Sequence, residues 1–327
     1  LDPYTLEQFG TESWVPLDGI SSHARLDEQT GELLFFNYSK HAPFMHYGVV
    51  GADNRLRHYV PIPLPGPRLP HDMAFTENYA ILNDLPVFWD EEMLERDIHA
   101  VRLHKDMPSR FAVIPRLGQP EDIRWFEADP TYVLHWLNAW EEGDEVVLDG
   151  YFQEHPVPGH YPDAPPGFER MMAYLDQSLL MPRLHRWRFN IRTGETREER
   201  LDDQTLEFGT INQRHAGRSY RYGYSAVPKK GWFLFTGFTK HDVETGDSWT
   251  IDLGKNRYGS EAGFAPRVGG TAEDDGYLVS FVTDLEEDRS EAILIDASDI
   301  EGGPVCRIIL PHRICSGTHA SWAHGED

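Results

Sequence analysis

The chain has 327 residues, of which 40% are hydrophobic, and its 30 basic and 54 acidic side chains give a formal net charge of −24. This charge argues against a nucleic-acid interface, which needs a basic face, and against electrostatic docking on an anionic membrane. With nine Trp, 17 Phe and 14 Tyr, the chain is too aromatic to be a disordered acidic polymer. We therefore expect a globular protein.

The chain contains two cysteines, Cys306 and Cys315, which form no CxxC pair. They indicate free thiols in a reducing compartment rather than a disulfide framework or a zinc-thiolate site. The sequence has no apolar run of about 18 residues that could span a membrane, and its first residues lack the basic and apolar regions of a signal peptide. We therefore predict a cytoplasmic protein without a transmembrane segment.

Short strands rich in aromatic and β-branched residues follow one another almost throughout the chain. The predicted strands are Glu32–Asn37, Tyr79–Leu82, Glu145–Phe152, His185–Ile191, Ser219–Ser225, Trp232–Gly237 and Tyr277–Val282. Three predicted hairpin turns combine Thr-Gly with an acidic residue, and in each the glycine supplies the positive φ that a tight turn requires: Thr30–Glu32, Thr193–Glu195 and Thr245–Asp247. Helical periodicity is limited to Phe168–Leu180, and Pro156–Pro166 is predicted to be an ordered surface loop.

No linker or low-complexity segment divides residues 1–327, which are therefore predicted to form a single domain. Many short strands without alternating helices predict an all-β sandwich, barrel or propeller. A single compact core rarely grows beyond roughly 250–300 residues. The length therefore favours a propeller, which grows by adding blades around an axis.

The sequence has no GxSxG, HExxH, P-loop or GxGxxG motif, so it gives no support for elbow-serine hydrolysis, helix-borne zinc or a glycine-cradled phosphate. It has 16 histidines, and four of them lie in distinctive segments: Ser21-Ser22-His23, Leu69-Pro70-His71-Asp72, Val133-Leu134-His135-Trp136 and Gly317-Thr318-His319. His71 and His135 are expected at strand ends, with Asn138–Glu145 as a polar turn after His135. Because a propeller brings strand ends together around one axis, these histidines can meet there. The other twelve are predicted to be ordinary structural or surface residues.

In these segments the chain resembles the carotenoid cleavage oxygenases, an iron-dependent, alkene-cleaving family that includes lignostilbene dioxygenases. The resemblance runs from Leu1 to about Trp322, and two acidic segments share it: Leu206–Asn212, and Ser260–Ala262 followed by Glu273–Tyr277. It implies a seven-bladed β-propeller with short helices and loops over the metal face, of which this chain covers most but not all blades.

The resemblance also implies a metal site in which His23, His71, His135 and His319 bind one Fe²⁺ on the propeller axis. Four neutral imidazoles suit a ferrous ion and leave two coordination positions for dioxygen or water. Since these ligands carry no charge, carboxylates that accept hydrogen bonds from their distal N–H groups are expected to support them. By resemblance, Glu207 orients His135 and Glu261 orients His319. Other acidic residues near the motifs are predicted to be surface charges: Glu141, Glu142 and Glu273.

The match departs from the family in two places. Family members are longer at the N-terminus, and that part carries a third supporting glutamate, for His71, and a tyrosine and a lysine that hold a phenolic hydroxyl in the lignostilbene branch. We therefore expect this chain to be a fragment that lacks blades needed to close the ring. The segment 314–319 lacks the family's usual Pro and Phe, which loosens the assignment of a substrate but not of the metal.

The activity implied by the resemblance is that of a non-haem Fe(II) dioxygenase. Such an enzyme cleaves a conjugated C=C bond of a carotenoid, apocarotenoid or stilbene-type substrate with O₂ into two carbonyl products, so its partners are a small apolar or aromatic alkene and O₂. The acidic charge and the lack of an apolar helix favour a soluble aromatic substrate. Four aromatic residues beside the motifs fit either a substrate tunnel or the core: Phe75, Trp136, Phe208 and Phe264.

Two other functions stay open. The first is a catalytically inactive β-propeller that binds a partner, with incidental histidines, which the missing N-terminal part would favour. The second is a propeller hydrolase that uses Ca²⁺ or Zn²⁺, although Ca²⁺ prefers clustered Asp and Asn oxygens to imidazoles.

Overall fold

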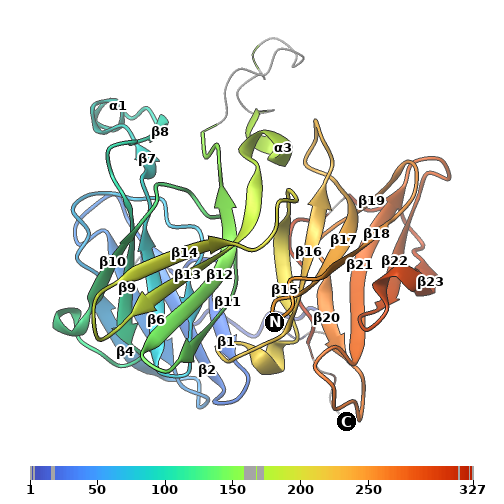
Figure 1. Cartoon of the computed structure of the whole chain (residues 1–327), viewed down its shortest axis with the longest axis horizontal. Coiled ribbons are helices and arrows are strands. Elements are labelled where there is room, and N and C mark those ends of the chain that lie inside the picture. Colours follow the sequence, from blue (N-terminus) through green and yellow to red (C-terminus); the bar gives the residue numbers. More distant parts are fainter. Residues whose placement is uncertain are drawn as a thin grey trace.

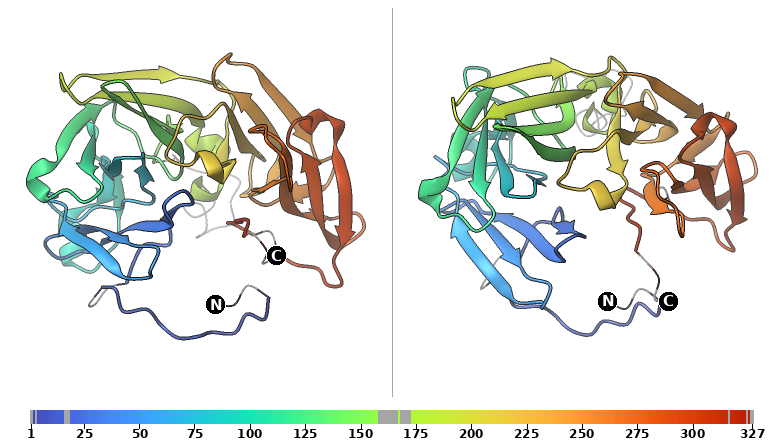
Figure 2. Two further views of the ribbon diagram at one scale, coloured as in Figure 1. Left: turned by 90° about the horizontal axis from the view of Figure 1, so that it is seen from below. Right: turned by 60° about the horizontal axis from the view of Figure 1, so that its bottom comes forward.

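The computed structural model of the chain describes residues 2, 4–15, 19–157, 167, 173–315, 317–323 and 325. Antiparallel β-sheet dominates this part of the chain (Figure 1). Four-stranded units succeed one another along the sequence and stand around a common centre (Figure 2). The fold is the all-β propeller expected from the sequence, and each unit is one blade.

The first three blades are separate four-stranded sheets. The first consists of β1 (Arg25–Asp27), β2 (Glu32–Tyr38), β3 (Met45–Val50) and β4 (Leu56–Pro61). The second consists of β5 (Ala74–Phe75), β6 (Tyr79–Asp84), β9 (Ser109–Pro115) and β10 (Arg124–Ala128). The third consists of β11 (Trp136–Glu142), β12 (Glu145–Gln153), β13 (Pro182–Asn190) and β14 (Thr196–Arg200).

The fourth and fifth blades belong to one nine-stranded sheet, because β19 (Arg257–Gly259) pairs with both β17 and β21. The fourth consists of β15 (Glu207–Ile211), β16 (Tyr222–Pro228), β17 (Phe235–Asp242) and β18 (Ser248–Asp252). The fifth consists of β20 (Gly263–Pro266), β21 (Gly276–Asp284), β22 (Arg289–Asp296) and β23 (Pro304–Ile309).

Short elements connect strands within the blades. A two-stranded sheet of β7 (Val87–Trp89) and β8 (Val101–Leu103) stands above the second blade with α1 (Glu91–Glu95), and α3 (Gln177–Leu180) lies near the same end of the molecule (Figure 1). Three 3₁₀ turns complete the described elements: η1 (Pro120–Asp122), η2 (Gln213–His215) and η3 (Ile300–Gly302). Among the described residues, no helix has the length and apolar character to cross a membrane.

Buried apolar side chains fill the space between neighbouring blades. One cluster joins the second and third blades around Phe111, Trp136 and Trp187, and another joins the fourth and fifth around Phe238 and Leu278. A third cluster contains residues of the first four blades. Because neighbouring sheets pack face to face through these clusters, core packing orients the blades and the inner strands that they carry.

Both views of Figure 2 show an open ring, in which the first blade (blue) does not meet the fifth (red). The N-terminal segment runs across this opening, and the chain after β23 turns back toward the centre of the ring. The described residues thus form five blades around an axis that both terminal segments approach.

Each of the seven predicted strands overlaps a strand of the structure, and the glycines of the three Thr-Gly turns have φ of +70° or +80° as expected. The polar turn predicted at Asn138–Glu145 is wrong, since β11 continues to Glu142 and the turn follows at Gly143. Of the predicted helix, 173–175 and α3 are helical, whereas 168–172 lie outside the described residues. The predicted loop Pro156–Pro166 also lies outside them after residue 157.

Candidate metal centre

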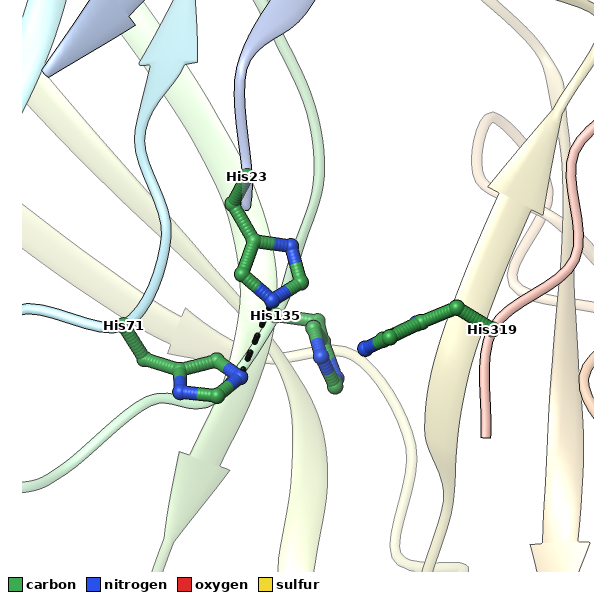
Figure 3. A group of neighbouring side chains, drawn as sticks. All are labelled: His23, His71, His135 and His319. Atoms are coloured by element: carbon green, nitrogen blue, oxygen red, sulfur yellow. Dashed lines mark hydrogen bonds between the residues drawn. The ribbon is translucent and has the colours of Figure 1, made fainter. Parts of the chain in front are cut away.

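The four distinctive histidines meet on the axis of the ring (Figure 3). His23, His71 and His135 lie just before β1, β5 and β11, which are the inner strands of the first three blades. His319 comes from the C-terminal segment, which approaches from the side of the fifth blade (Figures 2 and 3). Residues almost 300 positions apart therefore share one site because the inner strands surround a single axis.

One nitrogen of each imidazole faces the same small volume. One potential ligand atom from each ring lies within 4.8 Å of those of the other three. The Nε2 atoms of His23 and His71 are 3.1 Å apart. Two nitrogens that bind one ion at right angles through bonds of about 2.1 Å would be about 3 Å apart, so this separation fits adjacent metal ligands.

Burial keeps two of the imidazoles neutral. It lowers the pKa of His23 to about 3 and the pKa of His71 to about 4, because the charged form loses its hydration. A neutral imidazole offers a lone pair to a metal ion without first releasing a proton. His23 and His71 are therefore ready to act as ligands at neutral pH.

His135 is held by a buried carboxylate. Its Nδ1–H donates a hydrogen bond of 2.7 Å to Oε2 of Glu207, whose side chain has no exposed surface. Burial by itself lowers the pKa of His135, but the charge of Glu207 and this hydrogen bond outweigh it and raise the pKa. The other ring nitrogen, Nε2, is buried without a hydrogen-bond partner. An orphaned buried nitrogen is costly unless a ligand satisfies it, and a metal ion would do so.

His319 has a similar partner in a more open setting. Its Nδ1–H donates to Oε2 of Glu261 at 3.1 Å, and the backbone N–H of Ala320 donates to the same oxygen at 2.7 Å. The Glu261 side chain is mostly buried, whereas 46% of the His319 side-chain surface is exposed. Both histidine–glutamate contacts expected from the sequence are thus present, and the one at His319 is the more accessible to water.

Phe208 separates two of these histidines from the core of the fourth blade. Its ring centroid lies 4.7 Å from that of His135 and 5.4 Å from that of His319. The backbone of Phe208 has φ of +53°, an uncommon value for a bulky residue, at an irregularity in the pairing of β15 with β16. This backbone brings the Phe208 N–H to 2.6 Å from Oε2 of Glu207, so the strained residue helps to fix the carboxylate.

A cavity of about 620 Å³ opens beside the histidines along the axis. Its wall includes His23 and His319 together with residues of all five inner strands, among them Phe75, Trp136 and Phe264. These three aromatic side chains are almost fully buried, so they take part both in the core and in the cavity wall. The histidine cluster is therefore accessible from a partly open cavity with a partly apolar lining.

Two of the acidic residues predicted to be surface charges, Glu141 and Glu273, are half-buried and accept hydrogen bonds from a neighbouring blade. Glu141 accepts hydrogen bonds from the Thr76 hydroxyl at 2.6 Å and from the Asn78 backbone N–H at 2.9 Å. Glu273 accepts two backbone N–H groups at 2.7 Å, those of Arg221 and Tyr222. Glu141 ties the β5–β6 turn of the second blade to the third, and Glu273 ties the start of β16 in the fourth blade to the fifth, since backbone N–H groups in turns need an acceptor. Glu142 is exposed as expected.

The residues present fit a metal ion. Four imidazole nitrogens converge, one of them is buried without a partner, and two rings have their distal N–H bound to carboxylates, as is usual for histidine ligands. No thiolate or carboxylate belongs to the converging set, which suits a borderline divalent ion of the first transition series.

Comparison with known proteins places this site in a family. Residues 1–324 match the sequence profile described as retinal pigment epithelial membrane protein. The chain belongs to this family of carotenoid cleavage oxygenases. It is 35% identical over 321 residues to carotenoid 9,10(9',10')-cleavage dioxygenase 1 of Pisum sativum, an alignment that covers 92% of this chain and 57% of the pea protein. It is 30% identical to isoeugenol monooxygenase of Pseudomonas putida, covering 98% of this chain and 70% of that protein.

Solved structures share the fold. The lignostilbene dioxygenase of Pseudomonas brassicacearum superposes with a TM-score of 0.81 at 28% identity, covering 94% of this chain and 66% of the solved chain. A variant of the Synechocystis apocarotenoid oxygenase superposes with a TM-score of 0.85 at 23% identity, covering 99% of this chain and 70% of the solved chain. The chain thus spans only part of the length of its relatives. A four-histidine metal site is typical of the family, and the four converging histidines of this chain form a group that could hold a metal ion.

Proposed function

We propose that this chain carries the metal centre of a non-haem Fe(II) dioxygenase that cleaves a conjugated C=C bond of an apolar or aromatic alkene. The observation that carries the proposal is the convergence of four imidazole nitrogens on the axis, in a family that contains alkene-cleaving oxygenases. In the reaction both atoms of one O₂ enter the products, one in each of two carbonyl groups, so no further reductant is required.

The histidines and the glutamates of the site have different roles. His23, His71, His135 and His319 would hold the ion, while Glu207 and Glu261 orient two of the rings. Bound ferrous iron would supply the electron density that activates dioxygen, at the coordination positions that four imidazoles leave open. The buried rings of Phe208 and Phe264 place apolar surface near the site, which favours an apolar alkene.

Two substrate classes are proposed from the relatives. The pea and Synechocystis proteins are named for carotenoids and apocarotenoids, whereas the Pseudomonas proteins are named for isoeugenol and lignostilbene. Both classes have a conjugated C=C bond that yields two carbonyl fragments. An aromatic substrate is the first choice, because the chain is strongly acidic and the described residues include no helix suited to a membrane.

The proposal is tested by supplying the iron-loaded protein with a hydroxystilbene and, separately, with an apocarotenal, and by analysing the carbonyl products. We expect two aldehydes from one substrate class, with consumption of one O₂ per bond cleaved, and no product from His135→Ala. Iron-loaded protein that consumes no O₂ with either class would contradict the proposed activity, and would favour a propeller that only binds a partner.

A further inference from the structure

Arg25 and Asp72 form a buried ion pair directly beside the histidines. The Nε atom of Arg25 lies 3.1 Å from Oδ1 of Asp72, and its Nη2 donates to Oδ2. The Asp72 side chain has no exposed surface, whereas 30% of the Arg25 side chain is exposed. Neither residue belongs to the converging nitrogen set, so the pair needs an explanation of its own.

The pair joins three separate segments of the chain, each of which carries one histidine of the cluster. Arg25 follows His23 by two residues, and Asp72 follows His71 directly. The third segment is that of Trp136, the residue after His135: its backbone N–H donates to Oδ2 of Asp72 at 2.9 Å, and its carbonyl accepts from Arg25 at 3.2 Å.

Hydrogen bonds occupy all the acceptor positions of the Asp72 carboxylate. It accepts from Arg25 through both oxygens, from Trp136 through Oδ2, and from the backbone N–H of Met73 through Oδ1 at 2.7 Å. A carboxylate offers about four acceptor positions, so none is left to bind a metal ion directly. Arg25 also donates to the Met73 carbonyl at 3.1 Å. The pair is therefore a junction of three backbone segments rather than an additional ligand.

The fourth histidine is held differently. His319 comes from the C-terminal segment, which bonds to Glu261 through the His319 ring and through the backbone N–H of Ala320. Among the residues that the structure describes, no hydrogen bond of Arg25 or Asp72 reaches that segment. The site thus consists of three histidines tied together by one ion pair and a fourth tied separately.

We propose that the Arg25–Asp72 pair is a positioning device that fixes the spacing of His23, His71 and His135, so that a metal ion meets three preset ligands. This inference deepens the proposed function and rests on it. The physical reason is entropic and geometric: ligands held by charge-assisted hydrogen bonds lose less freedom when they bind, and their directions are set in advance.

The test uses Co²⁺ as a probe, since its visible absorption reports the ligand field directly. Metal-free protein is titrated with Co²⁺, and the dissociation constant and the spectrum at saturation are recorded for the parent chain, Asp72→Asn, Arg25→Gln and Arg25→Lys. We expect Asp72→Asn and Arg25→Gln to weaken binding roughly 10–100-fold and to shift the absorption bands at saturation. Arg25→Lys, which keeps the charge, should recover part of the affinity.

Glu291→Gln is the matched control, because Glu291 is also fully buried and paired with arginines, but in β22 of the fifth blade. It should lower the temperature of unfolding without changing the affinity or the spectrum. Because Arg25 is partly exposed, Arg25→Gln is expected to disturb folding less than Asp72→Asn. If Asp72→Asn does not fold, Arg25→Gln therefore tests the positioning role. Parent affinity and an unchanged spectrum in the folded variants would overturn the positioning role alone. A parent chain that binds no Co²⁺ would overturn the metal centre itself, and this inference with it.

Discussion

The Nδ1 atom of His135 lies 2.7 Å from Oε2 of Glu207, at a point where the glutamate side chain has no exposed surface. The same oxygen accepts the backbone N–H of Phe208, and the remaining oxygen, Oε1, has no hydrogen-bond partner. A buried carboxylate with a free oxygen is costly unless a positive charge lies nearby. A divalent ion on His135 would supply that charge, so ligand and carboxylate are expected to depend on each other.

Glu207→Gln is predicted to weaken iron retention about 10–100-fold, because the amide keeps the shape of the side chain but loses the charge that supports the His135 ring. Iron bound per chain after dialysis against a weak chelator measures the effect. Glu142→Gln is the control, since Glu142 is exposed and pairs with Arg188 at the surface. Equal iron in Glu207→Gln and the parent would contradict this role of Glu207.

Glu261→Gln is predicted to have a smaller effect than Glu207→Gln, near tenfold or below. The contact between His319 and Glu261 is longer, at 3.1 Å, and His319 is half exposed, so water can replace part of the lost interaction. The two variants are best compared in one experiment under the same chelator. A larger loss in Glu261→Gln would mean that His319, and not His135, depends most on its carboxylate.

A third prediction concerns Asp27, which joins three parts of the ring. Its buried carboxylate accepts hydrogen bonds from Arg116, after β9, at 2.6 Å and from Arg218, before β16, at 3.1 Å. Asp27→Asn should lower the free energy of unfolding by about 1.5–3 kcal/mol at neutral pH, because two guanidinium groups lose a charged partner. Chemical denaturation at several pH values measures it.

The destabilisation caused by Asp27→Asn is expected to depend on pH in one direction. Burial raises the pKa of Asp27, but the hydrogen bonds from Arg116 and Arg218 outweigh burial and hold the pKa below its ordinary value of 3.8. The stabilisation is therefore complete above that ordinary value and is lost as the pH falls below it. The difference between Asp27→Asn and the parent should be constant from pH 5 to 8, roughly, and shrink toward about pH 3. A difference that grows in acid would contradict this assignment.

The strand pattern and the chain length were sufficient to predict the propeller class, and the resemblance to the family supplied the four histidines that meet. Three of them lie just before inner strands, whereas His319 lies in the C-terminal segment. The resemblance was also sufficient to pair His135 with Glu207 and His319 with Glu261, although these partners are 72 and 58 residues apart. Both pairings followed from the order of motifs in a family rather than from local chemistry.

Other features could not be predicted from the same residues. The polar composition of Asn138–Glu145 indicated a turn, yet β11 continues through it, because Asn138 donates to the Arg218 carbonyl and Glu141 accepts from Thr76. These tertiary partners satisfy polar groups that would otherwise favour solvent. The Arg25–Asp72 pair joins residues 47 positions apart, and nothing in either local segment indicates the other. The positive φ of Phe208 has no sequence signal, since bulky residues rarely adopt it.

The most direct test of the metal centre is iron quantitation on the purified chain after expression with added iron. Four converging imidazoles predict about one iron per chain, and His71→Ala should reduce this to below about a tenth. His241→Ala is the matched control, because His241 is a buried histidine that bonds to Asp202 at 2.8 Å, away from the cluster, and this variant should keep its iron. A folded parent chain with less than about a tenth of an equivalent of iron, or a His71→Ala variant that binds as much as the parent, would contradict the four-histidine site.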